Sequence, residues 1–269
     1  LGAKDFELNI QKTEMEWQQQ ATPIECQIRD YTRKGMHALH MLQLEDAKSA
    51  FDVVYELKPN AYCWHAGVVE FYLGDYEAGA RRLQQNALLF ESKYGEPASE
   101  ERIWNCASLL KYRLANKKKK NSTLVCDLPT EDVPVERRKV LRLARDLFEC
   151  SSNNDAAGVA MARARLRATA DVGDPKKLDY KLWKLSSWYY LGLHYDATGD
   201  VNEAKKCMKK AIQQCSPASM DIIHTLPLLH MTIRDWFDDD ELFEEDEFFK
   251  DDDSTTIMTP SLLNNIDSN

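Results

Sequence analysis

The histidines are the residues of this chain whose type most often serves chemistry, and two of them stand close together. His37 and His40 are three residues apart, so on a helix both imidazoles would lie on one face and could begin a metal site. No cysteine or carboxylate stands at a matching spacing, and histidines in cores or on solvated surfaces are far commoner than ligands. The chain also contains no G-x-S-x-G, H-E-x-x-H, Walker or G-x-G-x-x-G motif. We therefore predict a non-enzymatic protein with no metal site, no cofactor and no small-molecule substrate.

Basic side chains gather in four clusters, which could contact the phosphates of a nucleic acid. The clusters lie at residues 117–120, 137–139, 163–167 and 205–210. No aromatic residues are interleaved with them for base stacking, and the acidic C-terminal segment would compete for the same positive charge. We interpret the clusters as solvated helix faces. A nucleic-acid-associated helical repeat protein stays the alternative interpretation.

The acidic residues are concentrated near the C-terminus. The net charge is −9, from 35 basic and 44 acidic residues, but twelve of the acids and one of the bases fall between positions 235 and 253. The remaining 32 acids and 34 bases form a body that is close to neutral. Paired bulky residues stand among the acids, and exposed pairs of this kind lower solubility unless a partner covers them. We predict that the acidic tail, 237–269, docks on a basic surface of a partner through Trp236, Phe237, Leu242, Phe243, Phe248 and Phe249.

Composition places these segments in a helical, globular protein. Hydrophobic residues make up 43% of the chain, and only 10 glycines and 9 prolines interrupt it. No run of about 18 apolar residues is present, which predicts no transmembrane span. The seven cysteines are an odd number without a C-x-x-C pair, so we expect neither a complete disulfide framework nor a zinc site. Most of them are expected to be buried thiols, in a reducing compartment.

An internal repeat defines the expected architecture. Residues 185–218 contain the order W-x2-L-G-x2-Y, followed by a Gly-Asp turn, small residues and a final proline. That order is typical of the tetratricopeptide repeat, a 34-residue pair of helices. Residues 28–59 and 60–92 give two further copies.

Glycines at the same position of each copy give the repeat a physical basis. Gly35, Gly67 and Gly192 would let the first helix of each pair approach the second closely, since a side chain there would hold the backbones apart. Small residues on the second helix would act from the other side: Ala47, Gly79 and Ala204. Three copies in register favour the repeat over a generic helix bundle with chance small residues.

The rest of the chain departs from this pattern. Residues 1–24 have no clean period and are expected to form an N-terminal arm before a helical domain at 25–236. The stretch 99–170 keeps helical periodicity but not the repeat, so we interpret it as a divergent region with a long insertion at 116–134. A last helix at about 219–236 would cover the apolar face of the final repeat. The sequence thus predicts an all-α, tetratricopeptide-type helical solenoid with a divergent middle region and a C-terminal capping helix.

The order of short motifs resembles one group of such proteins. The motifs are K-G-M at 34–36, E-L-x-P at 56–59, F-Y-L-G at 71–74, W-Y-Y-L-G-L-H-Y at 188–195 and R-D-W at 234–236. Together they look like the tetratricopeptide proteins of algae and plants that are similar to the bacterial lipoprotein NlpI. The resemblance implies a protein-binding scaffold or adaptor, in the chloroplast and as an accessory or assembly subunit of a photosynthetic, thylakoid-associated complex. A cytoplasmic protein is the alternative.

The repeat register also implies a protein-binding groove. In this family four positions of each first helix face the concave surface, and here they are mainly apolar and aromatic instead of the Lys and Asn of a carboxylate clamp. Such a surface would suit an amphipathic helix or an extended peptide. The alternative is that the chain's own arm or divergent region fills it. The expected groove residues are Arg29, Met36, Trp64, Val68, Phe71, Tyr189, Leu193 and Asp196.

Overall fold

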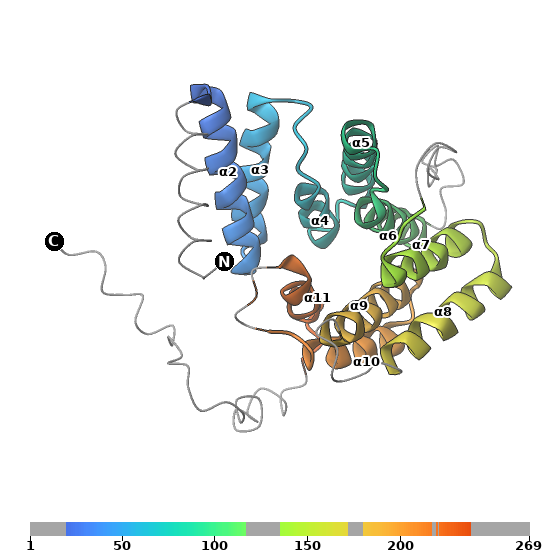
Figure 1. Ribbon diagram of the computed structural model, residues 1–269. Helices are drawn as coiled ribbons and strands as arrows, with labels where there is room; N and C mark the ends of the chain where they lie inside the picture. Colours follow the sequence, from blue (N-terminus) through green and yellow to red (C-terminus); the bar gives the residue numbers. More distant parts are fainter. Residues whose placement is uncertain (1–19, 117–134, 172–179, 217–218, 220, 238–269) are drawn as a thin grey trace, which may run out of the picture. The chain divides into compact units, whose positions relative to one another are not determined.

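The computed structural model of the chain describes residues 20–116, 135–171, 180–216, 219 and 221–237 (Figure 1). All regular secondary structure among these residues is helical, which confirms the all-α prediction. The chain divides into two compact units, Leu1–Arg234 and Asp235–Asn269. Most of the predicted arm, the insertion and most of the acidic tail lie outside the described residues. The helices are α2 (Pro23–His40), α3 (Leu44–Leu57), α4 (His65–Tyr72), α5 (Tyr76–Tyr94), α6 (Ser99–Ala115), α7 (Lys139–Ser152), α8 (Ala156–Asp171), α9 (Tyr180–Thr198), α10 (Val201–Ile212), the 3-10 helix η1 (Ile222–His224) and α11 (Leu226–Ile233).

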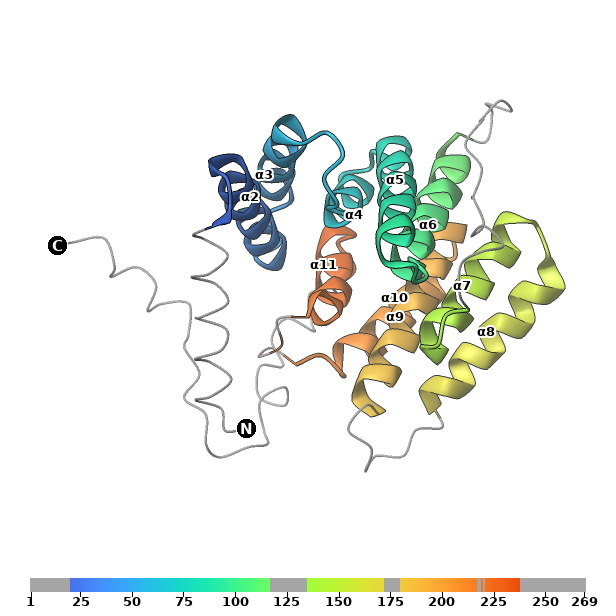
Figure 2. The same cartoon turned by 45° about the horizontal axis from the view of Figure 1, so that its top comes forward.

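Four pairs of helices share one kind of turn. The pairs are α2 with α3, α4 with α5, α7 with α8 and α9 with α10, and the members of each pair pack on one another (Figure 2). At each turn one residue takes a left-handed backbone conformation: Leu42, Gly74, Asn154 or Gly199. The N–H of the following residue donates to the carbonyl five residues earlier, over 2.8–2.9 Å. The same closure of a first helix therefore recurs four times along the chain.

Aspartates begin the second helix in three of these four pairs. Side-chain oxygens of Asp75, Asp155 and Asp200 each accept a hydrogen bond from the backbone N–H three residues later, at 2.9–3.2 Å. These N–H groups have no acceptor within their own helix, so a side chain that accepts from them stabilises the helix start. In these three pairs, a residue in the left-handed conformation followed by aspartate therefore marks the turn.

The glycines that were predicted to bring the helices of a pair together do so. A Cβ added to Gly67 or Gly192 would stand only 2.5 or 2.9 Å from the facing side chain, and one added to Gly35 would collide with an aromatic ring. Only glycine leaves room for such a close approach of two helices. The facing side chains are Leu83, Met208 and Phe51, respectively.

The pair α7–α8 has the same turn without the glycine. The sequence did not predict this pair, because its residues lack the glycine pattern of the repeat. Counted from the turn, the fully buried Leu147 stands where the other three pairs have glycine. Arg163 stands where they have a bulky apolar residue, and its guanidinium reaches His194 of α9 instead of packing on α7. The region 99–170 is therefore less divergent than predicted, since it contains a fourth pair with the common turn and a different contact.

Helix α6 brings the largest fully buried side chain of the described residues into the interior. Trp104 is 1% exposed, and its ring lies 5.1 Å from that of Phe71, 5.7 Å from Tyr72 and 6.3 Å from Tyr189. Aromatic rings at such separations stabilise one another beyond the burial of their surface. The contact joins α4, α6 and α9, which are far apart in the sequence.

The C-terminal cap is shorter than predicted. In place of one helix at 219–236, the structure has the 3-10 turn η1 followed by the eight-residue helix α11. Pro227 lies in the first turn of α11, where its missing N–H is tolerated but where it would interrupt a longer helix. Leu226, Leu229 and Met231 of this short helix are buried.

The cysteines of the described residues fit the expected thiols with one exception. Cys106 on α6 is disulfide-bonded. Cys63 and Cys207 are buried and free, and the remaining free thiols, which are half-buried, are Cys26, Cys150 and Cys215. Most of the described cysteines are thus thiols, as expected, but only Cys63 and Cys207 among them are buried.

Candidate functional site

The residues predicted to line a groove lie mostly in the interior. Val68, Phe71, Tyr189, Leu193 and Asp196 are at most 1% exposed. The remaining three, which are half-buried, are Arg29, Met36 and Trp64. The assignment of an open groove is therefore wrong at the five buried positions.

Helices from later in the sequence cover these positions. Arg234, which follows α11, places its guanidinium carbon 5.7 Å from the centre of the Phe71 ring. Trp104 of α6 packs on the rings of Phe71 and Tyr189. The alternative of a groove filled by the chain itself is thus closer to the structure, with α6 and α11 as the occupants.

A buried polar network holds this interior together. Asp196 of α9 accepts hydrogen bonds from Lys111 of α6 at 2.6 Å and from Arg234 at 3.2 Å. Its carboxylate also lies 3.4 Å from Nε2 of His230 on α11. The other ring nitrogen of His230 is 3.2 Å from the hydroxyl of Tyr72. One carboxylate therefore connects α6, α9 and α11.

The charge on Asp196 is stabilised despite its burial. Burial by itself would raise the pKa of this carboxyl, but the hydrogen bond from His230 and the positive charges of Arg234 and Lys111 outweigh it. The pKa of Asp196 is held well below its usual range, so the group is ionised at neutral pH. Removing one member of such a set would leave the others buried without compensation.

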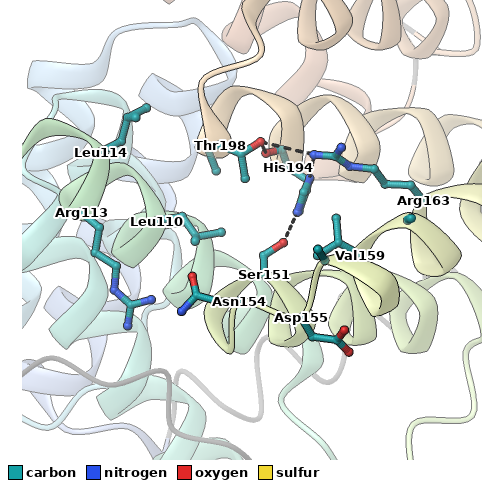
Figure 3. Close-up of a pocket in the computed structure, with 13 residues that line it drawn as sticks. Leu110, Arg113, Leu114, Ser151, Asn154, Asp155, Val159, Arg163, His194 and Thr198 are labelled. Carbon is teal, nitrogen blue, oxygen red and sulfur yellow. Dashed lines mark hydrogen bonds between the residues drawn. The ribbon is translucent and has the colours of Figure 1, made fainter. Parts of the chain in front are cut away.

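A separate pocket opens between α6, α7, α8 and α9, with a volume of about 640 Å³ (Figure 3). It lies at the fourth pair, where α8 carries alanines and Arg163 in place of the bulky packing of the other pairs. Small side chains leave space that larger ones would fill. The lining residues are Leu110, Arg113, Leu114, Ser151, Asn154, Asp155, Ala156, Val159, Ala160, Arg163, His194, Ala197 and Thr198.

A chain of three polar side chains forms one wall of the pocket (Figure 3). The Nε2 atom of His194 lies 2.5 Å from Oγ of Ser151, and Nδ1 lies 3.2 Å from Nη2 of Arg163. Because a guanidinium only donates, Nδ1 must accept, and the ring proton then sits on Nε2. Burial, with the nearby charge of Arg163, lowers the pKa of His194 to about 3, so the ring is neutral at pH 7.

This arrangement is the reverse of a nucleophile activated by histidine. The nitrogen that faces Ser151 already carries the proton and donates it to Oγ, so it cannot take the hydroxyl proton. A cation faces the other nitrogen, where a catalytic histidine needs an acceptor to orient it. What the wall offers to a ligand is hydrogen-bond donors: the hydroxyl of Ser151 and the guanidinium of Arg163.

The other chemical candidates have structural partners. Nδ1 of His40 lies 2.7 Å from the hydroxyl of Thr225, whereas His37 is exposed. Within the described ranges, no group of three His, Cys, Asp or Glu side chains could hold a metal ion. Among the basic clusters, Arg138 pairs with Glu136, and both Arg167 and Lys206 pair with Glu203.

Three further findings concern the remaining predictions and the identity of the chain. None of the helices in the described part of the chain has the length and apolar character needed to cross a membrane. Of the predicted tail contacts, only Trp236 and Phe237 fall within the described residues. Comparison of the chain with protein-family models, curated proteins and solved structures gives no match.

Proposed function

We propose that the protein is a non-enzymatic scaffold of the tetratricopeptide type, which holds partner proteins on a stack of helix pairs. The observation that carries the proposal is the recurrence of one turn in four pairs, three of which also share the glycine contact. A repeated pair cannot bury its apolar face alone, so it is typically found in stacks whose surfaces bind other proteins. The resemblance to the algal and plant relatives of NlpI supports an accessory role in a plastid complex.

The binding surface is proposed to lie at the fourth pair and not in the predicted groove. The buried groove positions of the second and last pairs, such as Phe71 and Tyr189, are covered by α6 and by the segment around α11. The pocket at α7–α8 remains open and combines apolar walls with hydrogen-bond donors. Sites of this kind commonly bind an anchoring side chain of a partner.

Pairing within the protein argues against nucleic acid as the partner. Arg138, Arg167 and Lys206 are all in contact with carboxylates, which would compete with phosphate. Binding driven by phosphates also weakens steeply with salt, whereas burial of apolar surface does not.

The test is capture of partners by the full chain, with and without nuclease. The protein, carrying an affinity tag, is mixed with an extract of the organism that encodes it, and bound proteins are identified by mass spectrometry at two salt concentrations. We expect a small set of proteins that survives both nuclease and about 300 mM salt, since apolar contacts resist screening. Capture that disappears with nuclease, or that leaves no protein specific to the bait, would overturn the proposal.

A further inference from the structure

We propose that the pocket between α6, α7, α8 and α9 binds an acidic peptide segment of a separate protein, taking one carboxylate side chain together with a neighbouring apolar side chain. This inference rests on the proposed scaffold function and adds the chemistry of the partner. It is argued from the charges, the hydrogen-bond donors and the apolar walls of the pocket in turn.

The charge of the pocket is positive. Arg113 and Arg163 line it, and neither forms an ion pair with a carboxylate of the described residues. The carboxylate of Asp155, which also lines the pocket, accepts a hydrogen bond from the N–H of Gly158 at 2.9 Å and caps α8. Several arginines elsewhere in the structure are paired with carboxylates, for instance Arg102 with Glu91 and Arg82 with Glu70. The pocket thus has cationic groups that a ligand carboxylate would complement.

The hydrogen-bonding groups on the wall of the pocket, the Arg163 guanidinium and the Ser151 hydroxyl, can donate to a ligand. The guanidinium of Arg163 uses Nη2 for His194 and Thr198, and its buried Nε has no acceptor among the described residues. The hydroxyl of Ser151 receives the proton of His194, which leaves its own hydrogen for another partner. The free hydrogen of the Ser151 hydroxyl and the positive charge of the Arg163 guanidinium therefore favour a ligand with acceptor oxygens over one with donors.

The opposite side of the pocket is apolar. Leu110 and Leu114 from α6 and Val159 from α8 line this side (Figure 3). Ala160 and Ala197 also line the pocket and add apolar surface. A volume of about 640 Å³ lies within the range of small-molecule sites, which leaves room for two neighbouring side chains of a peptide. A leucine or phenylalanine next to the ligand's carboxylate would bury its surface here.

These features favour a peptide over a nucleic acid. A phosphate could also meet the two arginines, but no Phe, Tyr or Trp lines the pocket for base stacking, and the ring nitrogens of His194 are occupied by Ser151 and Arg163. An acidic peptide supplies both the acceptor oxygens and the apolar group that the walls accommodate. The occupant is therefore assigned to protein, and nucleic acid becomes an outcome of the test.

The test measures binding of a labelled peptide to the full chain by fluorescence anisotropy. The probe is the hexapeptide Asp-Glu-Leu-Phe-Glu-Glu, compared with its uncharged analogue Asn-Gln-Leu-Phe-Gln-Gln and with a twenty-base oligothymidylate. Arg163→Gln removes the charge, Arg113→Gln removes the second cation from an exposed position, and Ala160→Phe fills the pocket. Arg165→Gln is the matched control, because Arg165 lies on the same helix, is exposed and does not line the pocket.

We expect binding of the acidic peptide to weaken about tenfold in Arg163→Gln and several-fold in Arg113→Gln, to be lost in Ala160→Phe and to be unchanged in the control. Equal binding of the uncharged peptide, or equal weakening by the control, would overturn the proposal. Displacement of the peptide by oligothymidylate, with the same dependence on Arg163, would assign the pocket to nucleic acid and overturn it too. Arg113→Gln and Ala160→Phe keep the test decisive if Arg163→Gln fails to fold.

Two comparisons separate this inference from its alternatives. A full chain in which the acids between 238 and 247 are replaced by Asn or Gln should bind the probe as the native chain does. Tighter binding would make the chain's own segment the occupant and would overturn the choice of a separate partner.

If only the inference fails, the native chain still captures proteins from extract and Arg163→Gln captures the same ones. If the proposed function fails, the native chain captures none.

Discussion

Substitution of alanine for glycine at two equivalent positions should change stability by different amounts. Gly35 and Gly192 each lie inside a first helix and face the second helix of their pair. A Cβ on Gly35 would collide with three atoms of the Phe51 ring, which is rigid and 1% exposed. A Cβ on Gly192 would come within 2.9 Å of the terminal methyl of Met208, the end of a flexible side chain.

The magnitudes follow from two opposing terms. Alanine is favoured over glycine inside a helix by about 1 kcal/mol. Overpacking a rigid contact costs about 1–3 kcal/mol, and three ring atoms within reach place Gly35→Ala at the upper end of that range. We expect Gly35→Ala to lose about 2 kcal/mol of the free energy of unfolding. Gly192→Ala should change it by no more than about 0.5 kcal/mol, because methionine adapts its rotamer at small cost.

The assay is equilibrium unfolding in urea, followed by circular dichroism at 222 nm. The slope of unfolding free energy against urea should stay constant, so that the shift in midpoint reports stability alone. Leu147→Gly in the α7–α8 pair is the converse control: it creates a cavity at a fully buried position and should cost several kcal/mol. Equal losses in Gly35→Ala and Gly192→Ala would refute the argument, since the two contacts would then not differ as the structure has them.

Three further outcomes are expected. Asp196→Asn should lower the unfolding free energy by about 3 kcal/mol and speed hydrogen exchange in α11, because it leaves two half-buried cations without their anion. Unchanged exchange would contradict this role. Stability should fall as the pH drops from about 6.5 toward 3, since the unfolded chain takes up protons that buried His194, with its pKa lowered to about 3, does not. His194→Gln should flatten this dependence in urea titrations without abolishing it, because the pKa of His65 is lowered to about 4 and the pKa values of His40, His230 and Asp196 are lowered as well. Tyr189→Ala should destabilise the fold by about 3–5 kcal/mol, as for other buried aromatics, whereas Trp64→Ala at a half-buried position should lower the melting temperature much less in a thermal scan.

The sequence predicted the helices and three of the pairs because these depend on local patterns. Periodicity of apolar residues identifies a helix, and a glycine opposite a bulky residue identifies a close pair. The fourth pair escaped because Leu147 stands at the glycine position. A signal was present in Asn154 followed by Asp155, since asparagine tolerates the left-handed conformation and aspartate caps the next helix.

The location of the site could not be predicted in the same way. Periodicity shows which face of α9 is apolar, but not that Lys111, 85 residues earlier, and Arg234, 38 residues later, converge on Asp196. The same holds for the pocket, where Arg163 and His194 meet across 31 residues. Such contacts depend on how pairs pack on one another, and no local pattern encodes them. The groove prediction failed at its five buried positions for this reason, because the sequence left open whether the chain itself fills the groove and could not show that α6 and the segment around α11 do.

The central claim, a scaffold that holds another protein at the α7–α8 pocket, is tested most directly by site-specific photo-crosslinking. Ala160, at the pocket, is replaced by p-benzoylphenylalanine in the full chain, and Asn202, exposed on α10, carries the same group in a control. Both proteins are irradiated in extract of the encoding organism, and crosslinked peptides are identified by mass spectrometry. We predict that position 160 crosslinks to an acidic segment of a separate protein and that position 202 does not. Crosslinks of equal yield at both positions, or none to protein at position 160, would contradict the account.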